Sequence, residues 1–316
     1  MINEEINKKL RIAVINGGNS AEAEVSRSSA KGVIQALKEN YAHVSSIELD
    51  QNLAESLSKF SVDVVFPALH GPPGEDGTLQ GFLEILGYPY VGSDVHGSAF
   101  AMDKIVSKSI FREAGLPLIK QTVVTRADGP AAAVNTIVKE LGNYVVVKPA
   151  RQGSALGITL IDNENQLHEA LGKAFKLDDR LLVEQRIDGR EITVGVIDTD
   201  EGSRAFPVID IITPEDSWYD YEHRYTVGLS EHIMPADLSG EQTQQLQQFA
   251  IAAHQILGCR DLSRADFIVD GENIYLLEVN TLPGMTPTSL YPDGAAGFGL
   301  SFVQLVSYLV ERAANR

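Results

Sequence analysis

The stretch that most constrains this chain is RADFIVDGENIYLLEVN, residues 264–280. Two apolar runs flank an Asp-Gly turn signal, so the stretch predicts an antiparallel hairpin. Because side chains alternate along a strand, Arg264 and Asp266 share one face of the first strand. By the same rule Glu278 and Asn280 share one face of the second strand. The two pairs of residues lie on the same side of the hairpin only if the loop between the strands has an odd number of residues. We therefore expect a loop of three or five residues.

On that shared face, Asp266, Glu278 and Asn280 place two carboxylates and a carboxamide among apolar side chains. Such carboxylates repel each other and are poorly solvated unless a cation joins them. All-oxygen ligands suit Mg²⁺ or Mn²⁺, and Mg²⁺ commonly links a few carboxylates to the phosphates of a nucleotide. An exposed face with solvated charges is the alternative, and the pattern alone leaves both open.

The composition is that of an ordinary globular chain. Its 316 residues suffice for two or three packed domains, and 44% of them are hydrophobic. A formal net charge of −17 argues against a nucleic-acid partner, although local lysines and metal ions can still attract a nucleotide. Cys259 is the only cysteine, so no intrachain disulfide is possible, which fits a reducing compartment. With no signal peptide and no membrane span in the sequence, we expect a soluble, cytoplasmic protein.

The first hundred residues predict an α/β unit. Strands are expected over residues 11–16, 44–49 and 62–69, with a helix over residues 21–38. The third strand is apolar enough to be buried on both faces, as parallel strands are. The loop from His70 to Gly77 follows it, at the end of a sheet where α/β proteins bind ligands. A tight turn that caps the next helix is the alternative for this loop. Neither the dinucleotide glycine spacing nor the Walker lysine loop occurs in the sequence.

The middle of the chain combines lysines with a glycine-rich loop. Residues 99–114 predict one amphipathic helix, on which Lys104 and Lys108 fall on a single stripe. A solvated face is the alternative to a functional role for Lys104. A strand ending at Lys148 leads into the loop Gly153 to Gly157. Backbone N–H groups of such a loop approach phosphates closely and the lysine neutralises their charge, so this pattern predicts a lid over phosphates. A glycine-rich hairpin loop without a ligand is the alternative.

The remaining segments complete the expected elements. Strands are predicted over residues 181–187 and 192–197, and a helix over residues 240–257. The stretch 213–229 has no clean period and holds the only tryptophan. A loop of that length is usually functional or disordered, and its aromatic content argues against disorder. The seven histidines have no metal-ligand or catalytic-triad spacing, so none is assigned to zinc or to nucleophilic catalysis.

Eight motifs, in this order, resemble the D-alanine–D-alanine ligase family of the ATP-grasp superfamily. They are GGNSAEAEVS (17–26), ALHGPPGEDGTLQG (68–81), AMDK (101–104), VVKPARQGSALG (146–157), VEQRIDGREIT (183–193), YDYEHRY (219–225), SRADF (263–267) and LLEVNTLPGMTPTSL (276–290). They cover essentially the whole chain. Together they are specific to this family, although no single motif is.

The resemblance implies an α/β fold, α+β in its central part, of the three-subdomain ATP-grasp type with an N-terminal Rossmann-like parallel sheet. The implied bounds are 1–97 for the N-terminal domain, 98–187 for the central ATP-grasp subdomain and 188–316 for the C-terminal ATP-grasp domain. The implied reaction is ATP-dependent ligation of two D-alanines through an acyl phosphate, for peptidoglycan precursor synthesis. That chemistry needs charge neutralisation and positioning rather than a protein nucleophile. A homodimer is also implied, without a nucleic-acid or membrane partner.

The resemblance further implies roles for individual residues. ATP is expected to contact Lys104, Lys148, Gly153, Ser154, Ala155, Glu184, Gln185, Ile187, Glu191 and Arg224. Two Mg²⁺ or Mn²⁺ ions are expected on Asp266, Glu278 and Asn280, with assistance by K⁺ left open. The amino acid substrates are expected to contact Glu22, His70, Arg264, Ser289 and Leu290. Catalytic roles are expected for Glu22, Ser154, Tyr225, Arg264 and Gly284, with Arg264 and the Gly284 N–H as oxyanion donors.

Three positions depart from the family pattern. Arg224 stands where members often have lysine, Ala155 where many have serine, and Gln185 where lysine is frequent. Tyr225 resembles members that use D-alanine as the second substrate, while His223 and His232 keep a hydroxy acid such as D-lactate open. Two alternatives to the ligase of D-alanine therefore stand: a related ligase of other amino or hydroxy acids, and a nucleotide-binding regulator without catalysis.

Overall fold

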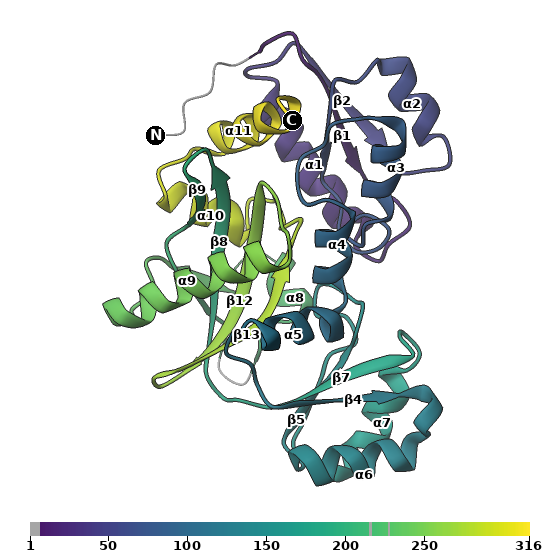
Figure 1. Cartoon of the computed structure of the whole chain (residues 1–316), viewed down its shortest axis with the longest axis vertical. Coiled ribbons are helices and arrows are strands. Elements are labelled where there is room, and N and C mark those ends of the chain that lie inside the picture. The colour runs from purple at the N-terminus through teal and green to yellow at the C-terminus, as the bar shows by residue number, and fades with distance from the viewer. Residues whose placement is uncertain (1–6, 215–216, 227) are drawn as a thin grey trace.

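The computed structural model describes residues 7–214, 217–226 and 228–316, and contains three sheets in sequence order along the chain (Figure 1). The first sheet is parallel, in the order β2-β1-β3. Its elements are β1 (Arg11–Asn16), α1 (Ala23–Leu37), β2 (His43–Glu48), α2 (Leu53–Phe60), β3 (Val64–Pro67) and α3 (Thr78–Leu86). All of β3 and all but one residue of β1 are buried, as parallel strands covered on both faces require. The predicted N-terminal α/β unit is confirmed.

Two short helices stand where the sequence predicted one helix over residues 99–114. They are α4 (Val95–Met102) and α5 (Lys104–Glu113). The break is at Asp103, whose backbone is extended and whose carboxylate accepts hydrogen bonds from the N–H groups of Ile105 and Val106, at 3.1 and 3.2 Å. An aspartate that caps new N–H groups in this way starts a new helix. The single-helix prediction was wrong.

The second sheet is antiparallel, in the order β4-β7-β5-β6. Its elements are β4 (Gln121–Thr125), the 3₁₀ helix η1 (Arg126–Asp128), α6 (Pro130–Leu141), β5 (Val145–Pro149), β6 (Thr159–Ile161), α7 (Glu164–Ala174) and β7 (Arg180–Gln185). Helices α6 and α7 cover one face of this sheet, and their apolar side chains share a core with β5 and β7 (Figure 1). The glycine-rich loop therefore joins the paired strands β5 and β6, with its residues outside the sheet.

The third sheet is also antiparallel, in the order β11-β10-β8-β12-β13, with β9 on β8. Its strands are β8 (Arg190–Thr199), β9 (Gly202–Ala205), β10 (Ile209–Ile212), β11 (Glu231–Ile233), β12 (Leu262–Asp270) and β13 (Asn273–Asn280). The accompanying helices are α8 (Tyr221–Tyr225), α9 (Gly240–Ile256), α10 (Leu290–Gly297) and α11 (Phe302–Ala314). The predicted class, α/β with an N-terminal parallel sheet, is confirmed.

The hairpin formed by β12 and β13 has a two-residue loop, so the predicted loop of three or five residues was wrong. Asp270 pairs with Asn273 across Gly271 and Glu272, and Gly271 has a φ of 57°, a left-handed conformation that glycine adopts without strain. The extra residue that the alternation requires lies in β13 and not in the turn. The register shifts between Asp266 and Phe267, so that Leu277 is an extra, bulged residue and Asp266 faces Glu278. The predicted shared face of the hairpin is confirmed, with a different cause.

Helix α11 returns from the end of the chain to the first sheet. It packs against α1 and β3, and its leucine and valine side chains share one apolar core with β1 and β3 (Figure 1). Helix α5 packs instead with α9 and β13 of the third sheet. The apolar cores therefore join elements that are distant in sequence.

Within the described ranges, no single helix is long and apolar enough to span a membrane. Helices α10 and α11 have the required length and composition only as a pair, and that pair is bent by 99°.

Candidate active site

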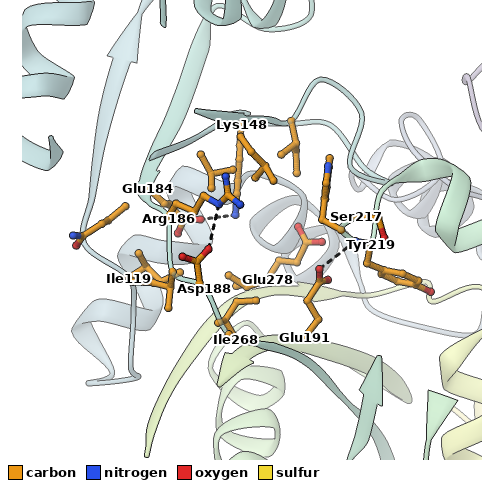
Figure 2. A pocket seen from close by; sticks show the side chains of 18 of the residues that line it. Ile119, Lys148, Glu184, Arg186, Asp188, Glu191, Ser217, Tyr219, Ile268 and Glu278 are labelled. Carbon is orange, nitrogen blue, oxygen red and sulfur yellow. Dashed lines mark hydrogen bonds and ion pairs between the residues drawn. The ribbon is translucent and has the colours of Figure 1, made fainter. Parts of the chain in front are cut away.

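A cavity of about 300 Å³ lies between the second and third sheets. The wall from the second sheet includes Lys148, Glu184 and Gln185, and the wall from the third includes Glu191 and Glu278 (Figure 2). Six of the residues expected at ATP line it: Lys148, Glu184, Gln185, Ile187, Glu191 and Arg224. Glu278, expected as a metal ligand, lines it too. The volume is in the range of sites for small ligands.

A buried carboxylate with two lysines forms one wall of this cavity. Glu184 contacts the Lys148 ammonium at 2.5 Å and the Lys108 ammonium at 2.7 Å. Burial alone raises the pKa of Glu184, but the two ammonium groups outweigh it and hold that pKa at about 2. Glu184 is therefore an anion at neutral pH, and one of its two counter-ions, Lys148, reaches the cavity (Figure 2).

The hairpin face forms the opposite wall. Arg264 donates two hydrogen bonds of 2.8 Å to Asp266, and the Asn280 amide donates to Asp266 at 3.1 Å. Glu278 forms an ion pair with Lys104 at 3.0 Å. Burial raises the pKa of Glu278, but Lys104 and Arg224 outweigh it and lower that pKa to about 2.

These side chains do not form the solvated face that was the alternative. The Asp266 and Glu278 side chains are 13% and 24% exposed. Two carboxylates and a carboxamide oxygen on one partly buried face are the donor set that Mg²⁺ or Mn²⁺ prefers. The residues present therefore fit the expected metal.

A second, smaller cavity of about 50 Å³ lies beside the first. All eight residues expected to contact the amino acid substrates or to act in catalysis line it: Glu22, His70, Ser154, Tyr225, Arg264, Gly284, Ser289 and Leu290. They come from the start of α1, from loops, from strand β12 and from helices α8 and α10, so only the fold brings them together. Gly153, Arg224 and Asn280 line it too.

Glu22, Ser154 and Tyr225 form a connected group in this cavity. The Ser154 hydroxyl donates to Glu22 and lies 2.6 Å from the Tyr225 hydroxyl, which also lies 3.4 Å from Glu22. Burial raises the pKa of Glu22 although both hydrogen bonds lower it. These hydrogen bonds join the glycine-rich loop to α8 and to the start of α1.

Three expected site residues line neither cavity. Lys104, Ala155 and Asp266 lie behind the walls. The Lys104 ammonium donates to the Gln152 carbonyl at 2.8 Å in addition to its pair with Glu278. Lys104 is 8% exposed, so the solvated stripe considered for it was wrong. Ala155 has a φ of 59°, an uncommon left-handed conformation for alanine that shapes the loop.

Several residues near the site were not predicted. Glu75 lines the smaller cavity, and burial together with the charge of Glu22 raises its pKa to about 8. Trp218 and Tyr219 line the larger one. Their signals were present, because the 70–77 loop and the aromatic stretch 213–229 were both predicted as candidate functional loops. Residues 215, 216 and 227 of that stretch lie outside the described residues.

His70, the first residue of the 70–77 loop, is buried, and its Nε2 lies 3.1 Å from the Ser29 hydroxyl. Burial and the nearby Arg264 charge lower its pKa to about 4. The unfolded chain binds a proton there below about 6.5, whereas the folded chain does not, so stability falls as the pH falls from about 6.5 to about 4.

His70→Gln is expected to lessen that loss by up to about 3 kcal/mol, because glutamine does not titrate. Urea unfolding at pH 7, 5.5 and 4 measures the difference, with the exposed His43→Gln on β2 as the matched control. Equal pH slopes in His70→Gln and wild type contradict a neutral, buried imidazole.

Two family models and several known proteins match this chain. The family model described as D-ala D-ala ligase C-terminus matches residues 110–311, and the one described as D-ala D-ala ligase N-terminus matches residues 48–93. A D-alanine–D-alanine ligase of Halalkalibacterium halodurans is 46% identical over 97% of this chain and 100% of its own length. One of Syntrophobacter fumaroxidans is 44% identical over 97% and 98%.

Solved structures agree as well. The D-alanine–D-alanine ligase of Bacillus anthracis complexed with ATP has a TM-score of 0.84 and 31% identity, over 97% of both chains. The enzyme from Coxiella burnetii also has a TM-score of 0.84 and 31% identity, over 98% of this chain and 95% of that one. The fold and the paired cavities define an ATP-dependent ligase with the ATP-grasp fold. The chain belongs to the D-alanine–D-alanine ligase family.

Proposed function

We propose that this chain joins two D-alanine molecules into D-alanyl-D-alanine, with conversion of ATP to ADP and phosphate, to supply a peptidoglycan precursor. The observation that carries the proposal is the meeting of the two cavities at the hairpin. Glu278 lines the larger cavity, whereas Arg264 and Asn280 line the smaller one. Asp266 accepts hydrogen bonds from Arg264 and Asn280 and lies opposite Glu278 in the strand pair, so it stands between the two cavities. A phosphate at one end of the hairpin face would therefore adjoin a carboxylate at the other.

ATP occupies the larger cavity in this proposal. Its adenine lies against Glu184, Gln185 and Ile187, where β7 ends, and its ribose hydroxyls lie against Glu191. The Glu191 carboxylate is held by the Tyr219 N–H at 3.1 Å, which supports a fixed orientation (Figure 2). Lys104, Lys148 and Arg224 contact the phosphates, covered by Gly153, Ser154 and Ala155.

The expected metals belong to the hairpin face. Asp266, Glu278 and Asn280 would hold Mg²⁺ or Mn²⁺, which neutralises phosphate charge when bound. The support is the donor set described above, two carboxylates and an amide oxygen. The number of ions, two, and any role of K⁺ are proposals from the family alone.

The amino acids occupy the smaller cavity. Glu22, buried beside Glu75, binds the ammonium of the first D-alanine, and neutral His70 lies beside that substrate. The first carboxylate attacks the γ-phosphorus of ATP, which releases ADP and forms an acyl phosphate. The amine of the second D-alanine then attacks the acyl carbon, a tetrahedral intermediate forms, and phosphate leaves. Ser289 and the backbone of Leu290 bind the second carboxylate with Arg264.

The oxyanion of that intermediate is stabilised by Arg264 and by the Gly284 N–H. A Cβ atom at Gly284 would lie 2.6 Å from the Ser289 hydroxyl, so only glycine lets this backbone approach the substrate-binding serine. The Glu22, Ser154 and Tyr225 contacts close the glycine-rich loop over the reaction and exclude water.

The domain bounds 1–97, 98–187 and 188–316 also belong to this proposal. The parallel sheet lies in the first range, the four-stranded sheet in the second and the six-stranded sheet in the third, which supports them. A homodimer, a cytoplasmic location and the lack of a membrane or nucleic-acid partner are proposed from the family and from the net charge of −17.

The first test is phosphate release from ATP and Mg²⁺ with D-alanine, L-alanine and D-lactate, with products identified by mass spectrometry. D-alanyl-D-alanine formed from D-alanine alone is the expected result. Turnover only with another acid would assign the chain to a related ligase of different substrate choice. ATP binding without turnover would favour the regulatory alternative.

Nucleotide binding has a built-in reporter, because the only tryptophan, Trp218, lines the larger cavity. We expect ATP with Mg²⁺ to change Trp218 emission saturably in the absence of D-alanine. The variant Trp218→Phe should lose that change and still bind ATP by calorimetry. An emission that stays constant while ATP binds contradicts the assignment of this cavity to the nucleotide.

A further inference from the structure

Lys108 is a buried cation one helical turn beyond Lys104 on α5. Its side chain is only 1% exposed. A buried ammonium is costly unless charged and polar partners surround it. Lys108 has two such partners: the Glu184 carboxylate at 2.7 Å and the Leu276 carbonyl at 2.8 Å.

These two partners belong to different sheets. Glu184 is on β7, which leads to the adenine side of the cavity, and Leu276 is on β13. Leu276 comes directly before the bulged Leu277, after which the strand presents Glu278. Lys108 thus lies behind the cavity, tied to the backbone of one wall and the carboxylate of the other.

Glu184 has a second counter-ion, Lys148, which is less buried than Lys108. The Lys148 side chain is 12% exposed and lines the cavity, whereas Lys108 is sealed away from it. Each lysine takes a different oxygen of Glu184, Oε2 for Lys148 and Oε1 for Lys108. Lys148 can therefore turn to a phosphate while Lys108 remains.

We propose that Lys108 is a positioning residue for ATP, the permanent counter-ion of Glu184 that frees Lys148 to bind phosphate. This inference rests on the proposed function, because it requires a nucleotide in the larger cavity. If Lys148 left Glu184 without Lys108 in place, a carboxylate that is 1% exposed would be buried unpaired. That cost would oppose phosphate binding and leave adenine binding largely unchanged.

The test compares Lys108→Met, Glu184→Gln and the double variant, with Arg112→Met on the exposed side of α5 as the matched control. Glutamine keeps an oxygen acceptor for adenine and removes the charge that retains Lys148. Trp218 emission is titrated with ATP and Mg²⁺, and separately with adenosine, without D-alanine. Thermal unfolding shows which variants are folded.

We expect Lys108→Met to weaken ATP binding by about tenfold or more, as for loss of a charged hydrogen bond, and adenosine binding by less than about threefold. The double variant should bind ATP within about threefold of Glu184→Gln, because the two changes are coupled. A merely structural role would weaken both ligands together and would not be relieved by the second change.

Two results overturn the inference. One is ATP affinity in folded Lys108→Met equal to that of wild type; the other is a double variant that binds ATP more than about threefold less tightly than Glu184→Gln. Should Lys108→Met unfold, the double variant against Glu184→Gln decides alone, and a large loss of ATP affinity there overturns it. Failure of the proposed function is separate, since wild type would then neither respond to ATP nor form the dipeptide.

Discussion

Arg264→Ala is expected to lower turnover by roughly 10²-fold or more, the effect of losing an oxyanion donor. The Arg264 side chain is 10% exposed and lines the smaller cavity. Its pair with Asp266 uses Nε and Nη2, so Nη1 lies outside that pair and is available to a developing oxyanion. Burial opposes its charge, but Asp266 outweighs burial and raises the pKa of the guanidinium. The group is a permanent cation at the reacting centre.

The measurement is steady-state kcat with D-alanine and ATP, together with ATP affinity from Trp218 emission. We expect kcat to fall while ATP affinity stays nearer to wild type, because Arg264 lines the substrate cavity and not the nucleotide cavity. Arg204→Ala on the exposed strand β9 is the matched control, since it removes one arginine from the same sheet. Turnover of Arg264→Ala within a few-fold of wild type would show that its assigned role is wrong.

Glu278→Gln is expected to abolish metal-dependent turnover. Glutamine keeps the size of the side chain and one oxygen, but removes the negative charge that holds a divalent cation. It also leaves Lys104 without its 3.0 Å partner on β13, so the positive charge near the phosphates is no longer balanced. Both effects act at the end of the face where phosphate transfer is proposed.

Titration with Mg²⁺ and with Mn²⁺, read by turnover and by Trp218 emission with ATP, separates loss of metal binding from loss of chemistry. Glu272→Gln in the exposed hairpin turn is the control, because it removes the same charge from the same hairpin away from the site. Normal turnover of Glu278→Gln at ordinary Mg²⁺ concentration would be incompatible with a metal site on this face.

The hairpin shows how far local reasoning reaches. Strand alternation predicted that Asp266, Glu278 and Asn280 share a face, and they do. It assigned the required extra residue to the turn, whereas the structure has it in β13 at Leu277. The difference arises because a bulge depends on how β13 pairs with β12, and both turn and bulge satisfy the same alternation.

Lys104 and Lys108 show what a local sequence pattern does not predict. Helical periodicity correctly predicted that both face one side, but it could not tell whether water or protein covers that side. In the structure Glu278 of β13 covers Lys104 from 174 residues further along the chain, and Glu184 of β7 covers Lys108 from 76 residues further along. The break at Asp103, a local capping signal, was in the sequence and was overlooked.

The strands of the first sheet, the glycine-rich loop, the hairpin face and the family could all be predicted from the sequence, because each depends on alternation, turn chemistry or motif order among near neighbours. The short strands β4, β9, β10 and β11 were not predicted. Only the tertiary structure decided which lysines are buried, which carboxylate each one neutralises, and that Ser154 meets Glu22 from 132 residues away. Burial and ion pairing depend on which surface covers a side chain. That is a property of the packed sheets and helices, and no local pattern carries it.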